Sequence, residues 1–289
     1  MFKKKKDQTY QSYWSISWNI FKKNKVAMVC LFIVILLCLI ALFAPLIAPY
    51  DPNKQVLTDR LMKPCGQHWF GTDDLGRDIF SRIIYGCRVS LSVGIISQII
   101  ATVIGYTMGV CAGYYVGKVY SVISFLIQVF SSFPFLLFAM AIMFVLGPGL
   151  INLYLALGLL GWASTARLIR GDVMRLKKME YIDACKVSGG NSFRIIMKHL
   201  LPNCLSTLIV TVTLGIPNAI MSEASLSFLG LGVKAPMASW GSMISFSQPY
   251  IRSATYYSVI PGLAIIITVL AFNMLGDGLR DALDPKLRS

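Results

Sequence analysis

The chain has 289 residues, of which 56% are hydrophobic and only 14% are charged, and its mean hydropathy is +0.66. A water-soluble domain of this length rarely has such a composition, so the lipid bilayer is the solvent that fits it. The formal net charge of +14 does not indicate a nucleic-acid-binding protein. Its lysines and arginines flank apolar segments, without a zinc-finger spacing, an RNA-binding aromatic motif or a helix-turn-helix context, and attraction to anionic lipid headgroups accounts for them.

Six apolar segments have close to the roughly 20 residues that cross a bilayer as a helix. In chain order they are expected at 26–48, 90–115, 119–146, 151–169, 204–222 and 255–275. The first is too long for a cleaved signal peptide and lacks a small-residue cleavage pattern before Tyr50, so we expect a retained helix. Residues 146–149 fit a tight turn between the third and fourth spans. The sequence therefore predicts an all-α, multi-pass membrane protein.

Basic residues set the expected orientation, because cationic loops beside membrane spans tend to remain in the cytoplasm. One basic group precedes the first span: Lys3, Lys4, Lys5, Lys6, Lys22, Lys23 and Lys25. A second follows the fourth span: Arg167, Arg170, Arg175, Lys177, Lys178, Lys186, Arg194 and Lys198. With six spans, both groups and both termini fall on the cytoplasmic side.

This topology divides the chain into five parts. They are a cytoplasmic basic segment at 1–25, a first transmembrane helix at 26–48, an extracytoplasmic loop at 49–89, a five-helix core at 90–275 that contains a cytoplasmic loop at 167–203, and a cytoplasmic tail at 276–289.

The seven cysteines and two histidines do not form a metal-binding pattern. Four cysteines lie within or at the edge of expected spans, where they serve as small apolar side chains: Cys30, Cys38, Cys111 and Cys204. There is no CxxC pair, and His68 and His199 fall on opposite sides of the membrane. Cys65 and Cys87 both fall outside, so a disulfide between them stays open.

Sequence motifs for catalysis are absent, since the chain has no Walker phosphate loop, nucleophile elbow or HExxH motif. We therefore expect a protein that is not an enzyme. A carrier driven by an ion gradient often has ionisable groups within its spans, and the six expected spans contain almost none. A carrier driven by a separate ATPase needs a cytoplasmic projection for that motor to bind, and the loop at 167–203 is the candidate.

Within this loop, 180–188 is expected to form a short helix, with Ile182, Cys185 and Val187 as its apolar contacts and Gly189 and Gly190 ending it. Either Asn191 or Ser192 is expected to cap a following helix. The apolar face of that helix would consist of Phe193, Ile195, Ile196 and Leu200. These residues alone leave open an ordinary amphipathic connector on the membrane surface.

Residues 180–189, followed by His199, Leu200, Leu201 and Pro202, resemble the EAA loop of ABC importer permeases. The family pattern is EAA, three residues, Gly, nine residues and Ile-x-Leu-Pro. Here Asp183 replaces Glu, Cys185 replaces the second Ala and His199 takes the Ile position. The resemblance implies that an ATPase subunit grips this short helix and moves it as a lever. The residues it implicates are Glu180, Tyr181, Asp183, Ala184, Cys185, Gly189 and Pro202.

A second block, 68–82, resembles the outer-loop signature of dipeptide, oligopeptide and nickel permeases. Its candidate interface residues are Gly71, Thr72, Asp73, Asp74, Gly76, Arg77 and Asp78. Its carboxylates and arginine can interlock by charge-assisted hydrogen bonds at the outer mouth or at a subunit interface. A solvated turn is the alternative, and a calcium loop is disfavoured because the EF-hand frame is missing.

The block 222–232, with Trp240 and Gly241 after it, matches the same subfamily. So do the C-terminal positions Asn273, Gly276, Asp277, Arg280, Asp281 and Pro285. Glu223 and Ser225 are candidates for a gate or pathway, and a buried structural hydrogen bond is the alternative for Glu223. The arrangement of one N-terminal span, a long outer loop and a five-helix core resembles the C-type member of the peptide permease pair.

The resemblance implies a type I ABC importer permease fold of six transmembrane helices, with an extra N-terminal helix before the five-helix core, in the bacterial cytoplasmic membrane. It implies a homologous second permease, two cytoplasmic ABC ATPases and an extracytoplasmic peptide-binding protein as partners. This chain would hold no cofactor, and ATP and magnesium would belong to the ATPases. Short peptides are the expected cargo. Nickel complexes or other small solutes are the alternative cargo. An ion-coupled carrier or channel, or a membrane scaffold, is the alternative function.

Overall fold

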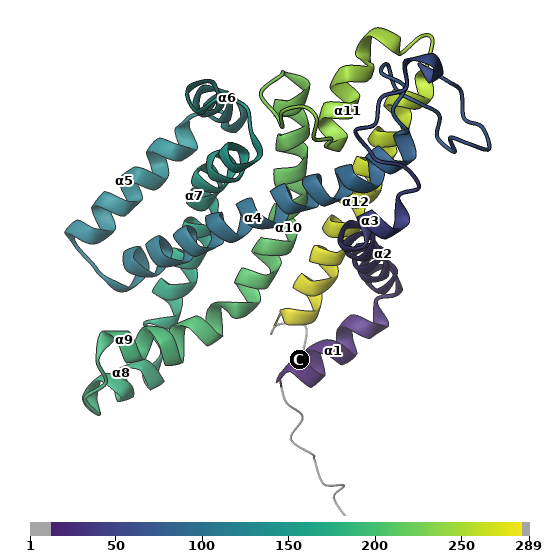
Figure 1. Cartoon of the computed structure of the whole chain (residues 1–289). Helices are drawn as coiled ribbons and strands as arrows, with labels where there is room; N and C mark the ends of the chain where they lie inside the picture. Colours follow the sequence, from purple (N-terminus) through teal and green to yellow (C-terminus); the bar gives the residue numbers. More distant parts are fainter. Residues whose placement is uncertain (1–12, 285–289) are drawn as a thin grey trace, which may run out of the picture.

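The computed structural model describes residues 13–284, and within them the chain is helical apart from its connecting loops (Figure 1). The expected all-α fold is confirmed. Lys3, Lys4, Lys5, Lys6 and Pro285, which entered the sequence argument, lie outside the described residues.

The helices before the long loop are α1 (Tyr13–Lys23), α2 (Lys25–Leu42) and α3 (Ala44–Ile47). The loop contains one 3-10 turn, η1 (Leu57–Asp59). Then follow α4 (Ile79–Tyr114), α5 (Lys118–Ser132), α6 (Phe135–Leu146), α7 (Leu150–Leu176), α8 (Glu180–Val187), α9 (Ser192–Ile195) and a π turn, η2 (Ile196–Leu200). The chain continues with α10 (Leu201–Phe228), α11 (Trp240–Ser247), a 3-10 turn, η3 (Gln248–Tyr250), and α12 (Thr255–Leu283).

Four helical segments of the described chain are long and apolar enough to cross a membrane. They are α2, α4, the run from Ser192 to Phe228 that ends with α10, and α12. A fifth exists if α5 and α6, which meet at 91°, are counted as one span. The expected span at 151–169 lies in α7, which is 27 residues long but less apolar. Polar and charged side chains, among them Asn152, Arg167 and Arg170, lower the hydropathy of α7.

The expectation of one continuous helix over 119–146 is corrected by the bend between α5 and α6. Phe133 has an extended backbone, and Pro134 follows it. The proline ring disfavours a helical conformation at the residue before it, so the chain turns there.

The second expected span also begins earlier than residue 90. The side chain of Asp78 accepts a hydrogen bond from the Ser81 backbone nitrogen at 2.8 Å and caps α4. The loop therefore ends at Asp78 instead of residue 89, and α4 reaches 36 residues.

Helices α4 and α7 form the most extensive helix pair (Figure 1). Gly105, Gly109 and Gly113 lie on one face of α4, four residues apart, against α7. A Cβ atom on Gly109 would lie 2.8 Å from both the Ala166 carbonyl oxygen and Ile169 Cβ. The absence of side chains lets the two backbones approach closely, as is common between membrane helices.

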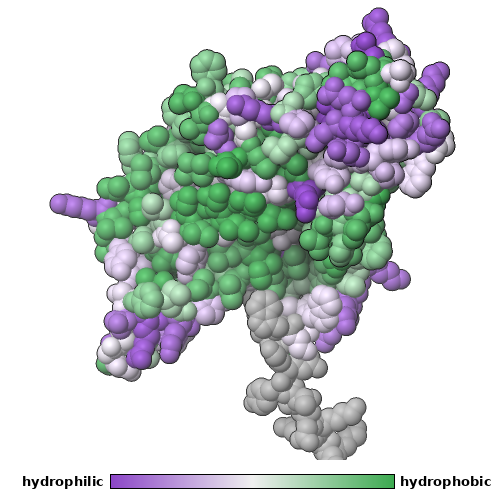
Figure 2. Space-filling model, in the orientation of Figure 1, coloured by the Kyte–Doolittle hydropathy of each residue, from purple (hydrophilic) through white to green (hydrophobic). Residues whose placement is uncertain are grey.

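Hydrophilic residues gather at two opposite ends of the molecule, with an apolar band between them (Figure 2). One end, the loop end, contains residues 49–78 and α11, and the other, the α8 end, contains α8 and α9 (Figure 1). The apolar band has the position that a bilayer would cover.

Candidate functional site

Helix α8 projects from the α8 end and is anchored by a single buried side chain. Ile182 is fully buried in a cluster with Val110 of α4 and Ile169 and Val173 of α7. Most of the other α8 residues are exposed, including Glu180, Tyr181, Asp183 and Ala184, while Cys185 is half-buried. The sequence-predicted lever residues of α8 thus share one projecting helix.

A glycine turn ends α8. Gly189 has a φ of +80°, and no atom lies within 4 Å of the position of its missing Cβ. A residue with a side chain would be strained there even though space is available. The Gly190 nitrogen then donates to the Cys185 carbonyl at 2.9 Å, which closes the helix.

Asn191 caps α9, which settles the choice between Asn191 and Ser192. Its side-chain oxygen accepts a hydrogen bond from the Arg194 nitrogen at 2.8 Å. After the π turn, Pro202 lies in the first turn of α10, within the continuous helical run from Ser192 to Phe228.

The surface around α8 combines apolar and charged groups. Lys186 Nζ donates to Asp183 Oδ1 at 2.7 Å, and this hydrogen bond raises the pKa of the Lys186 ammonium. Val187 is 90% exposed and Phe193 is 72% exposed. The expected apolar contacts of Val187 and Phe193 are therefore wrong. Ile182 fills the buried face of α8, and Ile195 and Leu200 fill the buried face of the following helix. We call Tyr181, Asp183, Ala184, Val187 and Phe193 the α8 surface, and large apolar side chains exposed outside the apolar band are typical of a protein contact.

Polar contacts join the α8 region to the end of α4. Lys177 Nζ donates to the Tyr114 carbonyl at 2.5 Å and lies over the Tyr114 ring. The Tyr114 hydroxyl in turn donates to Ser192 Oγ at 3.4 Å. Together with the packing of Ile182, these contacts connect the α8 region to α4 and α7.

A cavity of about 1400 Å³ lies between α4, α6, α7, α10 and the end of α12. Its border is rich in uncharged polar side chains: Ser97, Gln98, Ser164, Thr165, Asn203, Ser206, Thr207, Thr211, Asn218, Ser222 and Ser225. Charged residues border it toward the α8 end, among them Asp172, Arg175 and Arg280. The cavity is large enough for a small polar solute.

The two sequence candidates for a gate or pathway differ in position. Ser225 borders the cavity, whereas Glu223 does not. Glu223 is fully buried, and its carboxylate accepts hydrogen bonds from Ser227 at 2.6 Å, Ser239 at 2.7 Å and Ser90 at 3.4 Å. Ser239 is the N-cap of α11, so this carboxylate ties α11 to α10 and α4.

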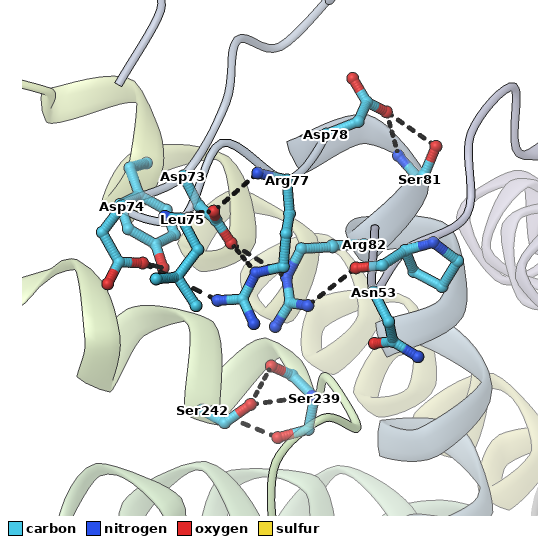
Figure 3. A network of polar contacts seen from close by, with 12 residues as sticks. Asn53, Asp73, Asp74, Leu75, Arg77, Asp78, Ser81, Arg82, Ser239 and Ser242 are labelled. Carbon is cyan, nitrogen blue, oxygen red and sulfur yellow. Dashed lines mark hydrogen bonds and ion pairs between the residues drawn. The ribbon is translucent and has the colours of Figure 1, made fainter. Parts of the chain in front are cut away.

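The loop end contains a buried cluster of charged groups, which we call the loop clamp (Figure 3). Asp73 is fully buried, and its carboxylate lies 2.6 Å from Arg77 Nε and 3.4 Å from Arg82 Nε. Arg82 Nη1 also donates to the Pro52 carbonyl at 2.9 Å. The clamp is therefore not a solvated turn, because one carboxylate joins the loop to the start of α4.

Neighbouring contacts extend the clamp. The Tyr257 hydroxyl of α12 donates to Asp74 at 3.2 Å, and His68 Nδ1 lies 2.9 Å from Asp78 Oδ1. Thr72 donates to the Asp59 carbonyl and accepts from the Met62 nitrogen. Tyr257, Asp59 and Met62 lie outside 68–82, and spacing within that block gave no signal for them.

The backbone geometry of the loop requires glycine at two positions of the signature. Gly71 and Gly76 have φ values of +77° and +71°. A Cβ on Gly76 would lie 1.8 Å from the Val56 carbonyl oxygen, so only glycine fits against the opposite side of the loop.

Cys65 and Cys87 are both free thiols, so the disulfide left open by the sequence does not form here. Among the described residues, no group of three His, Cys, Asp or Glu side chains is placed to hold a metal ion.

Residues 102–289 match the family model described as the binding-protein-dependent transport system inner membrane component. Residues 12–64 match the model of the N-terminal transmembrane domain of oligopeptide transport permease C.

Curated relatives match almost the whole chain. The dipeptide transport system permease protein DppC of Bacillus subtilis (strain 168) is 45% identical over 278 residues, 96% of this chain and 87% of the relative. The glutathione transport system permease protein GsiD of Pectobacterium atrosepticum is 41% identical over 98% of this chain and 95% of the relative. The oligopeptide transport system permease protein OppC of Bacillus subtilis (strain 168) is 41% identical over 96% of this chain and 91% of the relative.

Among solved structures, a chain of the inward-facing MetNI methionine ABC transporter is similar with a TM-score of 0.57. It is 20% identical and covers 70% of this chain and 96% of that chain. This likeness shows a shared fold.

Proposed function

The chain belongs to the family of binding-protein-dependent transport system inner membrane components, and we propose that it is the permease subunit of an ATP-driven importer of short peptides. It is an integral protein of the bacterial cell membrane with the fold of a type I importer permease. The N-terminal match indicates the C-type subunit.

One observation carries the choice of cargo. Three relatives with at least 41% identity over nearly the whole chain are named for dipeptides, oligopeptides and glutathione, all of which are short peptides. The cavity agrees with such cargo, because part of its border consists of hydroxyl and amide groups that can bind peptide-bond atoms without selecting a side chain.

We infer that the importer contains a homologous second permease, two cytoplasmic ATPases and an extracytoplasmic peptide-binding protein. The α8 surface is proposed as the site where an ATPase binds, which places the α8 end and both termini in the cytoplasm. ATP and magnesium would then be bound by the ATPases, outside this chain. The loop end would face the peptide-binding protein.

The proposed cycle is a shift between two conformations of the permease pair. ATP-driven closure of the ATPases would move α8, and the contacts of Ile182 and Tyr114 would pass that motion to α4 and α7. The cavity would open alternately to the two sides of the membrane.

The test is uptake by the complete importer, reconstituted in proteoliposomes with ATP and the binding protein on the appropriate sides. We expect accumulation of labelled alanine di-, tri- and tetrapeptides that requires ATP hydrolysis. Accumulation that follows an imposed ion gradient without ATP would instead indicate an ion-coupled carrier. Accumulation of nickel complexes but not of peptides would contradict the proposed cargo.

A further inference from the structure

The cavity is elongated, because it follows α10 over most of that helix. It borders α10 from Pro202 to Ser225, which at about 1.5 Å per residue is a distance of about 35 Å. An extended tripeptide spans only about 10 Å, so peptides of several lengths fit along this cavity. A site that holds all of them in one place must recognise a group that every peptide has at the same end.

The charged side chains of the cavity gather at one end of it. Each charged residue that the structure describes on the border belongs to the C-terminal part of α7 or of α12: Asp172, Arg175, Arg280 and Asp284. Arg175 lies in the last turn of α7 and Arg280 in the last turn of α12. We call these two residues, which separate helices bring to one border, the arginine pair.

A ligand in the cavity can reach both members of the arginine pair. The Arg175 side chain is 66% exposed, and Arg280 is exposed as well. A guanidinium group has five N–H donors in a planar fork that matches the two oxygens of a carboxylate. Binding at these donors therefore requires no change in how the helices pack.

The guanidinium groups are only weakly held by the protein. The Arg280 side chain forms no hydrogen bond or ion pair with another described residue. Arg175 Nη2 lies 3.3 Å from Asp172 Oδ1, and an exposed ion pair of this kind contributes little free energy. The Asp172 carboxylate has a partner of its own, because the Thr207 hydroxyl donates to Asp172 Oδ2 at 2.5 Å. The arginine pair is therefore available to an anionic group of the cargo.

A short peptide has one group that suits the arginine pair. Its C-terminus is a carboxylate at neutral pH, whatever its sequence or length. Hydrogen bonds from arginine to a carboxylate are about twice as strong as those between neutral groups. The hydroxyl and amide side chains along the rest of the border carry no charge, so the carboxylate finds its counter-charge at this end.

We propose that the arginine pair binds the C-terminal carboxylate of the cargo, with Arg280 as the main contact residue; this rests on the function proposed above. The rest of the peptide would extend along α10 toward Ser225. Anchoring at one end accounts for the passage of peptides with different lengths and sequences through one cavity. It makes a free C-terminal carboxylate the feature that the cavity recognises.

The test measures equilibrium binding of labelled trialanine and of trialanine amide, which differ only at the C-terminus. The complete complex of permeases and ATPases is purified and assayed without ATP or binding protein, so that the binding protein adds nothing to the signal. Arg280→Gln and Arg175→Gln each remove a guanidinium charge but keep a polar side chain. Arg194→Gln is the matched control, because Arg194 is an exposed arginine of α9 at the same end of the molecule and does not border the cavity.

We expect the parent complex to bind trialanine about tenfold more tightly than its amide, which is the difference between a charge-assisted and a neutral hydrogen bond. Arg280→Gln should remove most of this preference by weakening the binding of trialanine, with less than about a twofold effect on the amide. Arg175→Gln should weaken trialanine binding about threefold, since Asp172 already shares that guanidinium group. The control should match the parent complex for both peptides.

Equal binding of the two peptides by the parent complex, or no saturable binding, would overturn this inference. An unchanged preference in both arginine variants would also overturn it, because the two arginines would then serve only the ends of their helices. ATP-dependent uptake of trialanine by the parent importer is measured in parallel. If uptake occurs, these failures leave the proposed function intact, whereas its absence would overturn the proposed function and this inference together.

Discussion

At the scale of single residues, the environment of Glu223 favours a positioning role over a pathway role. Its carboxylate accepts three hydroxyl hydrogen bonds and does not border the cavity. Glu223→Ala leaves those hydroxyls without their acceptor, at about 1–3 kcal/mol for each group that stays unpaired. We expect a lower midpoint of thermal unfolding of the purified complex, by about 2–4 °C per kcal/mol.

Two further variants sharpen this prediction. Asp277→Ala removes an exposed carboxylate from α12 and should leave the unfolding midpoint unchanged. Glu223→Gln keeps one acceptor and should retain both stability and transport. A stable Glu223→Gln complex that no longer transports would show instead that the charge acts in gating.

Asp73 gives a second prediction at this scale. Asp73→Asn removes the carboxylate that two buried guanidinium groups share. Breaking a buried pair costs about 3–5 kcal/mol, because the remaining charge stays buried without compensation. Trypsin added at the loop end should then cleave at Lys54 or Arg60 about a hundredfold faster, which corresponds to about 3 kcal/mol.

The control for Asp73→Asn is the variant Asp51→Asn in the same loop. Asp51 is exposed and accepts a hydrogen bond from the Asn53 nitrogen at 2.8 Å. Its loss should change cleavage little. If Asp73→Asn is cleaved as slowly as Asp51→Asn, the clamp does not hold the loop.

At the scale of helices, the close contact between α4 and α7 predicts the effect of a larger residue at Gly109. Gly109→Ile places a branched side chain where Ala166 and Ile169 already lie. Overpacking of this kind costs about 1–3 kcal/mol or more. We expect a reduced yield of monodisperse protein in size-exclusion chromatography. Gly171→Ile on α7, where no atom lies within 4 Å of the added Cβ, should behave like the parent protein, and equal losses for both would contradict tight packing as the cause.

Helices were the part of the fold that sequence could predict, because apolar length alone identifies a membrane span. The bend between α5 and α6 was not predicted, although Pro134, which causes it, is present in the sequence. The residues on both sides of Pro134 are apolar, so hydropathy alone predicted one continuous span. The start of α4 was missed because the Asp78 cap is a polar feature outside the apolar run.

The site was predictable only where its residues are neighbours in sequence. The lever residues share one short helix, so the pattern at 180–189 located them together. The loop clamp needs Pro52, Arg82 and Tyr257, and the cavity border needs α4, α7 and α10. Such groupings depend on how helices pack, and one sequence does not specify that packing.

At the scale of the whole molecule, a short exposed helix is joined to the helices that border the cavity. Ile182 is the one buried residue of α8, and the segment that follows this helix joins it to α9. That segment turns at Gly189, whose positive φ sets the direction from α8 to α9. Distortion at this turn would therefore alter the coupling between α8 and the cavity without disturbing the membrane helices.

Gly189→Val tests this coupling, and Gly117→Val is its control. Both glycines have a φ near +80° and open space around the missing Cβ, so both variants bear backbone strain without a steric clash. Gly117 joins α4 to α5 and lies outside the lever. We expect both variants to assemble and hydrolyse ATP, but Gly189→Val should lower peptide uptake per ATP about tenfold, a loss of about 1.4 kcal/mol of coupling free energy. Equal uptake per ATP in the two variants would mean that α8 does not transmit the motion of the ATPase.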